Sequence, residues 1–293
     1  MSASNQPPAR HLRARHRREK AFRWLCLAMT CTALVLLIVL LVALVGQGAR
    51  GIDWDFLTSY PSRRPSAAGI KSALAGTLWV MVLTALLSVP LGVAAAVYLE
   101  EYAGRNRLNS LIAVNIANLA GVPSIVYGML GLALFVRGIG LGRSVLAGAL
   151  TLTMLILPVI IIASREAIRA VPGTLRQAAY ALGATRWQTI RDHVLPAALP
   201  GVMTSVILAL SRAIGETAPL IMVGALSYVA FVPTSLRSEF VVMPIQIFNW
   251  ASRPQEAFHA LAASAILVLL AMLLSMNAVA VSLRHRTERK HSW

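Results

Sequence analysis

The sequence predicts an all-α membrane protein with six transmembrane helices and both termini in the cytoplasm. Three observations predict this class: 57% of the residues are hydrophobic, the mean hydropathy is +0.69, and the apolar residues gather in long uncharged runs. Each run approaches or exceeds the ~18–20 residues needed to cross a bilayer core. The runs cover Trp24–Ala49, Ser72–Leu99, Leu108–Val136, Ser144–Ser164, Val194–Ser211, which continues past two charges to about Val232, and Ala257–Leu283.

The net charge of +16 fits membrane topology better than nucleic-acid binding. With both ends inside, the segments predicted to face the cytoplasm carry 18 Lys and Arg residues, and the outer loops carry eight. Because inner loops of membrane proteins are enriched in these residues, the count chooses the cytoplasm for both termini. We therefore expect membrane lipid, and no nucleic acid, beside the basic N-terminal segment.

The chain divides into a basic tail (1–23), a six-helix transmembrane domain (24–283) and a second cytoplasmic tail (284–293). The first apolar segment has a core of about 20 residues, longer than the 7–15 of a signal-peptide core. This length favours a retained anchor over a cleaved signal peptide.

The first and last predicted helices lack proline, and the four between them carry Pro90, Pro123, Pro158 and Pro219. A proline leaves the carbonyl four residues earlier without its donor. In hydrocarbon such a carbonyl is tolerated where it faces protein or a wet cavity. We therefore expect the second to fifth helices to surround a pathway, while simple packing kinks are the alternative for any one proline.

The cytoplasmic loop 165–198 carries its own pair of short helices. The first presents an apolar face at i, i+3, i+4, i+7 spacing, made of Leu175, Ala178, Ala179 and Leu182. Gly183 follows where a left-handed C-cap is favoured. The second helix presents Trp187, Ile190 and Val194 and ends before Pro196. An amphipathic helix pair in such a loop offers a helix for a partner's groove.

The fifth helix contains two charges, Arg212 and Glu216, on one face at i, i+4 spacing. Each charge at mid-bilayer costs about 2.5–3.5 kcal/mol, so something must offset them. Gly215 and Pro219 mark the expected break in this helix, and a broken helix exposes the dipole ends that transporters use to hold ions. In one interpretation the ion pair holds the helices in register. In the other, Arg212 is the positively charged group at which an oxyanion binds, and Glu216 orients the Arg212 side chain. The rarity of intramembrane charges favours the second interpretation.

The outer loop 230–260 carries an apolar-aromatic patch, Pro244 to Trp250. Trp250 and Trp54 are expected as interfacial anchors, and docking of an external protein is the alternative. The sequence contains no P-loop motif and no zinc-ligand spacing, so neither ATP binding nor a metal site is expected in this chain.

Residues 172–196 resemble the EAA loop of bacterial ABC importer permeases. The resemblance rests on Gln177-Ala178-Ala179, Gly183 and Leu195-Pro196 at the family's spacing, with Gln177 in place of Glu and His193 in place of Ile. It implies the type I importer permease fold, and it implies that this loop couples the permease to a partner ATPase. The coupling residues are then Gln177, Ala178, Ala179, Leu182, Gly183, Trp187, Leu195 and Pro196.

Three further stretches are similar to the PstA-type permease subunits of phosphate-specific bacterial ABC importers. They are Ala213 to Leu220, Leu119 to Gly128, and Pro244 to Pro254. The resemblance implies that Arg212 and Glu216 take part in transport. We also place Thr217 in the pathway, with the hydroxyls of Ser124 and Tyr127 beside the break at Pro123; packing is the alternative for these two hydroxyls. It implies as partners a second, PstC-like permease, an ATPase dimer that binds ATP and Mg, and an external phosphate-binding protein.

The resulting prediction is a permease subunit of an ATP-driven phosphate importer in the bacterial cytoplasmic membrane. This chain itself is expected to be neither an enzyme nor a cofactor-binding protein. A permease for a related oxyanion, such as sulfate or molybdate, is one alternative. A membrane scaffold or phosphate-sensing partner is another, and the two intramembrane charges argue against it.

Overall fold

The computed structural model describes residues 9–104, 106–224 and 228–291, and these residues form helices joined by turns and loops. Residues 1–8 and 292–293 of the predicted tails, Arg105, and residues 225–227 of the fifth apolar run lie outside the described residues. The long helices are α1 (Ala9–Gly48), α3 (Lys71–Val97), α6 (Val145–Arg169), α9 (Leu195–Ile214) and α12 (Glu256–His291). The shorter helices are α2 (Trp54–Thr58), α4 (Arg107–Ala120), α5 (Ser124–Gly131), α7 (Gly173–Ala181), α8 (Arg186–Thr189), α10 (Ala218–Val223) and α11 (Met243–Ala251).

Several short helical turns extend or join these helices. Three are π-helical: η3 (Tyr98–Tyr102) after α3, η4 (Leu132–Gly138) after α5, and η5 (Ile190–Val194) between α8 and α9. Two are 3-10 turns in the first outer loop, η1 (Ala49–Gly51) and η2 (Pro65–Ala67).

Within the described residues, five helical stretches are long and apolar enough to cross a membrane. A sixth span is complete when α4 and α5–η4 are counted together, because this pair is bent by 101° at its break. The all-helical class and the number of spans predicted from the apolar runs are confirmed, with the third span broken into two parts.

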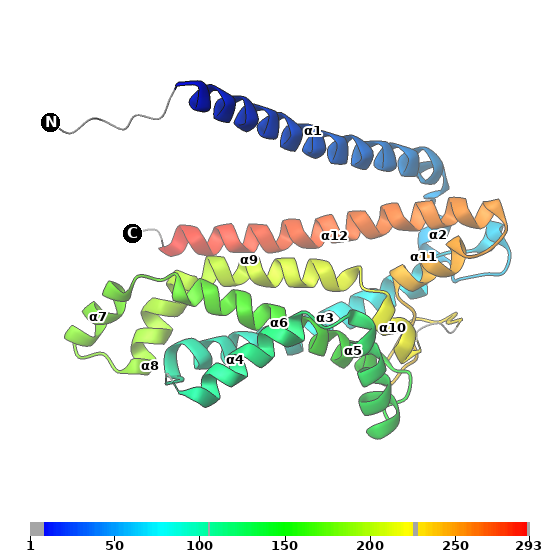
Figure 1. Ribbon diagram of the computed structural model, residues 1–293. Helices are drawn as coiled ribbons and strands as arrows, with labels where there is room; N and C mark the ends of the chain where they lie inside the picture. The colour runs from blue at the N-terminus through cyan, green and yellow to red at the C-terminus, as the bar shows by residue number, and fades with distance from the viewer. Residues whose placement is uncertain (1–8, 105, 225–227, 292–293) are drawn as a thin grey trace.

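The start of α1 and the end of α12 lie at the same end of the molecule as α7 and α8 (Figure 1). α1 meets α12 near Gly48, where a Cβ atom would stand 2.6 Å from the backbone of Ala263. The Ser264 hydroxyl donates to the Gly48 carbonyl at 2.8 Å. Both helices continue into the predicted tails, because α1 begins at Ala9 and α12 ends at His291.

The core is built around α6, which packs against α3 on one side and α9 on another. Leu152, Ile156 and Ile160 of α6 are at most 1% exposed. Gly92 of α3 allows the close approach, since a Cβ there would stand 2.5 Å from Cγ2 of Ile160. α1 is different: it lies apart from these helices (Figure 1), and its apolar side chains are exposed along most of its length.

Prolines break two of the four middle spans and leave the other two continuous. The chain breaks at Pro123 and before Pro219, but Pro90 and Pro158 lie inside unbroken α3 and α6. α9 also contains Pro200, so the expectation of one proline in each middle helix was wrong. Each break has a glycine shortly before the proline, Gly121 and Gly215, and a glycine adds backbone freedom that proline alone does not supply.

The outer loop 230–260 folds back onto the core as α11, and it corrects one expectation. Trp250 is fully buried, with its ring centroid 6.1 Å from that of Phe56, so it is a core residue and no interfacial anchor. Thr77 of α3 holds the start of α11 by accepting the Met243 N–H at 2.9 Å. Trp54 is 77% exposed, as an interfacial residue would be.

The fifth span starts earlier than the charge pattern predicted. α8, η5 and α9 form one helix from Arg186 to Ile214, so the second helix of the loop does not end before Pro196. Pro196 falls in the first turn of α9, directly after the π-helical turn η5. We attribute the continuity of the helix to this wider turn. Its hydrogen bonds join residues five apart and not four, so the helix continues past the position where proline has no N–H to donate.

Candidate functional site

The break between α9 and α10 brings three of the predicted pathway residues together. α9 ends at Ile214, and Gly215, Glu216 and Thr217 form the non-helical link to α10. The Arg212 Nε donates to Oε1 of Glu216 at 3.1 Å. Pro219, in the first turn of α10, frees the Gly215 carbonyl. The Thr217 hydroxyl lies 3.4 Å from that carbonyl oxygen.

The two charges of this pair are unequally exposed. The Arg212 side chain is 55% exposed and that of Glu216 only 15%. Among the described residues Glu216 is the only hydrogen-bond or ion-pair partner of the guanidinium. Nε is engaged, and the two terminal amino groups of Arg212 are available to an anion. Because guanidinium is planar and always charged, it suits a phosphate-like oxyanion.

The second break, between α4 and α5, packs against the first. α5 lies on α10, and Gly128 permits the contact because a Cβ there would stand 2.7 Å from Cα of Pro219. The Tyr127 hydroxyl donates to the Leu119 carbonyl at 2.8 Å, and Tyr127 is 3% exposed. Ser124 begins α5 and is half-buried. Among the described residues no hydrogen bond joins Ser124 or Tyr127 to Arg212 or Glu216, so the structure places these two hydroxyls at the neighbouring break.

The predicted coupling segment forms α7, a glycine turn and α8. Gly183 adopts a φ of +83°, the left-handed conformation expected from its position. A capping box begins α8, in which the side chains of Thr185 and Gln188 each bond to the backbone of the other residue. The two helices project beyond the ends of the long helices (Figure 1).

The apolar face predicted for α7 is divided in the structure. Ala179 is buried and Leu175 is half-buried, whereas Gln177 and Ala178 are exposed and Leu182 is 89% exposed. Leu182 is exposed because α7 ends at Ala181, so this residue lies in the turn and does not follow the helical face. In the second helix Ile190 and Val194 are buried, and Trp187 is 53% exposed. Leu195 and Pro196 are half-buried in the first turn of α9.

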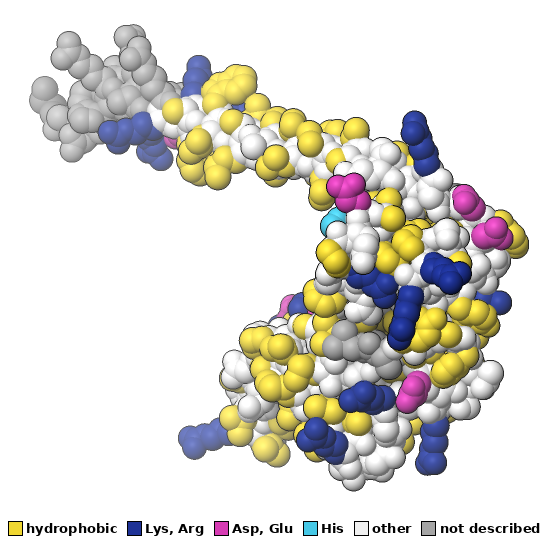
Figure 2. Space-filling view, turned by 90° about the vertical axis from the view of Figure 1, so that its right-hand side faces the viewer, with side chains coloured by type: hydrophobic (Ala, Val, Ile, Leu, Met, Phe, Trp, Pro, Cys, Tyr) yellow, Lys and Arg dark blue, Asp and Glu magenta, His cyan; other side chains and the backbone are white. Residues whose placement is uncertain are grey.

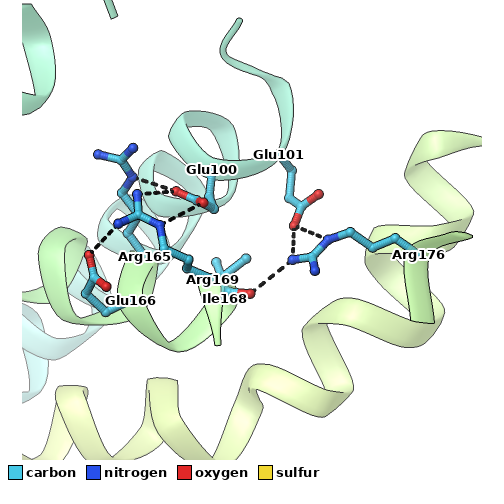
Figure 3. A network of polar contacts seen from close by, with 7 residues as sticks. All are labelled: Glu100, Glu101, Arg165, Glu166, Ile168, Arg169 and Arg176. Carbon is cyan, nitrogen blue, oxygen red and sulfur yellow. Dashed lines mark hydrogen bonds and ion pairs between the residues drawn. The ribbon is translucent and has the colours of Figure 1, made fainter. Parts of the chain in front are cut away.

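A network of ion pairs that was not predicted from the sequence ties this segment to the end of α3 (Figure 3). Glu100 of η3 accepts from Nε of Arg165 at 2.8 Å and from two nitrogens of Arg169, each at 3.0 Å. Arg169 also donates to Glu166, one turn earlier, at 3.0 Å. Glu100 thus joins the last turns of α6 to η3.

Glu101, the next residue of η3, holds the coupling segment itself. Its Oε1 accepts from Nε and a terminal nitrogen of Arg176 at 3.0 and 2.6 Å. Arg176, on α7, also donates to the carbonyls of Ile168 and Val171 at the end of α6. Arg186, which begins α8, donates to the Glu101 backbone carbonyl, and its guanidinium lies 5.0 Å from the ring centroid of Tyr102.

A sequence signal for this network exists. Two adjacent carboxylates, Glu100 and Glu101, end the second apolar run, and the arginines of the loop 165–198 follow the fourth. Arg165 and Arg169 are four residues apart, which places both on one helix face. In the prediction these arginines were counted only as cytoplasmic positive charges that set the membrane topology. Nothing in the sequence indicated which carboxylate each would meet.

No group of three or more His, Cys, Asp or Glu side chains that could hold a metal ion occurs in the part of the chain that the structure describes. The polar groups at the two breaks and at η3 are arginines, carboxylates and hydroxyls. The arginines and hydroxyls can donate hydrogen bonds to an anion, and the carboxylates pair with the arginines.

Comparisons with known proteins bear on these features. Residues 88–289 match the family model described as "Binding-protein-dependent transport system inner membrane component". The chain is 34% identical over 228 residues to the "Probable ABC transporter permease protein YqgI" of Bacillus subtilis, covering 77% of this chain and 76% of the relative. It is 35% identical over 266 residues to the "Phosphate transport system permease protein PstA" of Mycobacterium leprae, covering 89% and 86%.

Solved structures share the fold. A bacterial alginate ABC transporter in complex with its alginate-bound periplasmic protein matches with a TM-score of 0.67 at 16% identity, covering 92% of this chain and 96% of that one. The MetNI methionine ABC transporter in an inward-facing conformation matches with a TM-score of 0.59 at 15% identity, covering 72% and 93%. At these identities the likeness concerns the fold alone.

Proposed function

We propose that this chain, which belongs to the family of inner membrane components of binding-protein-dependent transport systems, carries inorganic phosphate. It is a multi-pass inner membrane permease subunit of an ABC importer, and ATP hydrolysis belongs to a separate subunit. The relatives named as phosphate transport permeases support the choice of anion.

The single observation that carries the proposal is the half-exposed Arg212 at the break of the fifth span. An oxyanion that approaches the α9–α10 link meets a fixed positive charge, and Glu216 holds the Nε side of that guanidinium. Arginine matches the oxygens of phosphate with parallel N–H donors. In this reading the ion pair orients Arg212 between transport events, and phosphate takes its terminal amino groups.

The coupling role follows from the exposed apolar residues at the tip of α7 and α8. We infer that Leu182 and Trp187, with Tyr180 at 45% exposed, insert into a groove of the ATPase subunit. We further propose a PstC-like chain as the second permease and a phosphate-binding protein as the external partner. η3 would then transmit motion of the coupling segment to α3 and α6.

The test is uptake of labelled phosphate in cells that lack this chain and are restored with wild type or with Arg212→Ala. We expect wild type to restore phosphate uptake that excess sulfate does not compete away. Arg212→Ala should abolish uptake, while co-purification shows that the complex still assembles.

Arg237→Ala is the matched control, because Arg237 is an exposed arginine of the outer loop with no ion pair among the described residues. It should retain uptake. Retained uptake in Arg212→Ala would remove Arg212 from the pathway, and competition by sulfate would assign the transporter to a different oxyanion.

A further inference from the structure

A polar cavity of about 720 Å3 lies beside η3, and none of the roles described so far uses it. Its walls are η3, the flanking residues Ala103, Gly104 and Asn106, the first turns of α4 and the last turns of α6. Arg107, Asn109 and Ser110 line it from α4, and Arg165 and Arg169 line it from α6.

The cavity holds more positive than negative charge. Among the described residues, three guanidinium groups line it, and Glu100 is the only carboxylate. Glu100 accepts from both Arg165 and Arg169, which fixes these two side chains next to each other. Arg169 also pairs with Glu166, so two carboxylates against three arginines leave a surplus of one positive charge, which an anion would neutralise.

Two of the arginines have donors to spare. Arg165 bonds to Glu100 through Nε, and its terminal amino groups point away from the network in Figure 3. Arg107 is exposed and has no hydrogen-bond or ion-pair partner among the described residues. Planar guanidinium donors of this kind match the oxygens of a phosphate group.

The position of the cavity favours a lipid as the source of that phosphate. α4 begins at Arg107, and the apolar span of α6 ends at Arg169, so the cavity lies where hydrocarbon gives way to headgroups. It is at the end of the molecule that carries α7 and α8 (Figure 1). On α4, Leu108 and Leu111 are 63% and 59% exposed and offer an apolar surface to acyl chains beside the polar cavity.

We propose that this cavity binds a phosphate group, and that an acidic phospholipid such as phosphatidylglycerol supplies it. Arg107 and the terminal amino groups of Arg165 hold the phosphate oxygens, while the acyl chains lie along α4. Basic pockets between transmembrane helices at the cytoplasmic boundary are typical sites for acidic headgroups. Inorganic phosphate has the same chemistry and is the second source. The proposal does not require phosphate to be the imported substrate.

The experiment uses the complete transporter purified with its partner subunits and counts retained phospholipids by native mass spectrometry. Phosphatidylglycerol and phosphatidylcholine are added in separate arms, and inorganic phosphate is added as competitor in a third. We expect wild type to retain phosphatidylglycerol selectively. Arg107→Gln should weaken retention roughly fivefold, the effect of losing one basic residue at a membrane surface.

Two variants serve as controls. Arg107→Lys keeps the charge and should keep most of the binding. Arg191→Gln removes an arginine from the same end of the molecule whose partner is its neighbour Asp192 at 2.7 Å, and it should retain the lipid like wild type.

The outcomes separate the two sources. Loss of phosphatidylglycerol in Arg107→Gln alone supports the lipid. An Arg107-dependent site that inorganic phosphate fills, without lipid selectivity, supports the phosphate-group site with the second source. Equal retention of both lipids in all variants, with no phosphate binding, would overturn the proposal.

Discussion

At the scale of single residues, two hydroxyls donate to backbone carbonyls that lack their usual helical donor because of a proline. Pro123 has no N–H to give to the Leu119 carbonyl, which accepts instead from the Val122 N–H at 3.1 Å and from the Tyr127 hydroxyl at 2.8 Å. Pro219 likewise has no N–H to give to Gly215, whose carbonyl lies 3.4 Å from the Thr217 hydroxyl. An unsatisfied backbone group is costly inside a membrane. Two hydroxyls expected along the pathway therefore stabilise the breaks that shape it.

Tyr127→Phe tests this role. The substitution keeps the ring and removes the hydroxyl, so the Leu119 carbonyl loses one of its two hydrogen bonds. We expect a loss of stability of about 1 kcal/mol, read as a lower midpoint of thermal unfolding of the purified protein. Tyr180→Phe is the matched control, because Tyr180 is 45% exposed and its hydroxyl has no bond among the described residues. An unchanged midpoint for Tyr127→Phe would contradict the role.

At the scale of elements, η3 is the junction between the transmembrane core and the coupling segment. Glu100 binds α6, the Glu101 side chain binds α7, and the Glu101 carbonyl binds the start of α8 (Figure 3). A π-helical turn carries one more residue than an α-turn. We infer that this geometry helps the adjacent carboxylates Glu100 and Glu101 to face different helices.

Glu101→Gln is expected to uncouple ATP hydrolysis from uptake. Glu101 is 7% exposed at the side chain, and removing one partner of a buried ion pair costs about 3–5 kcal/mol. Without this ion pair α7 is tied less firmly to η3 and α3, so the assembled complex should hydrolyse ATP with little phosphate uptake.

Glu166→Gln is the matched control for this variant, because it removes a carboxylate that is 60% exposed and pairs only within α6. It should leave the ratio of uptake to ATP hydrolysis unchanged. If Glu101→Gln behaves in the same way, η3 has no part in coupling.

The turn between α7 and α8 yields a second prediction about coupling. Gly183 has a φ of +83°, which most side chains adopt only with strain, and no atom within 4 Å would touch an added Cβ. Gly183→Glu adds that strain, of about 1–2 kcal/mol, and a charge at the proposed contact with the ATPase. We expect ATP hydrolysis without uptake.

Gly183→Asn separates the backbone from the surface, because asparagine tolerates the left-handed conformation and carries no charge. It should keep most of the coupling. Full coupling in Gly183→Glu would argue against docking at this turn.

At the scale of the whole molecule, the charge distribution and the fold agree on the topology. The start of α1, the end of α12, and α7 and α8 share one end (Figure 1), which is the end to which the charge count assigns 18 Lys and Arg residues. Figure 2 shows the opposite end, where basic side chains are dispersed among acidic and apolar ones. Because inner loops hold the excess of positive charge, we predict that the end with α7 and α8 is cytoplasmic.

Reporter fusions measure this orientation directly. A reporter enzyme that is active only outside the cytoplasm should be inactive when joined after Trp293 and active when inserted at Ser62, in the first outer loop. A cytoplasmic reporter should give the reverse pattern at the same two points. Activity of the first reporter at the C-terminus would overturn the predicted topology.

The sequence by itself determined the spans, the two breaks and the left-handed turn at Gly183, and it predicts the orientation. These features depend on local causes: apolar length, the count of basic residues, and the backbone limits of proline and glycine. The pairing of Arg212 with Glu216 was likewise readable from their i, i+4 spacing, and the structure places their atoms 3.1 Å apart.

Tertiary structure decided what lies next to what. Trp250 is in the core because α11 folds back onto α3 and meets Phe56, 194 residues earlier in the chain. Glu101 meets Arg176, 75 residues later, and Leu182 is exposed because α7 ends one residue before it. Contacts between distant residues depend on how whole helices pack, and no local pattern of charge or hydropathy specifies that packing.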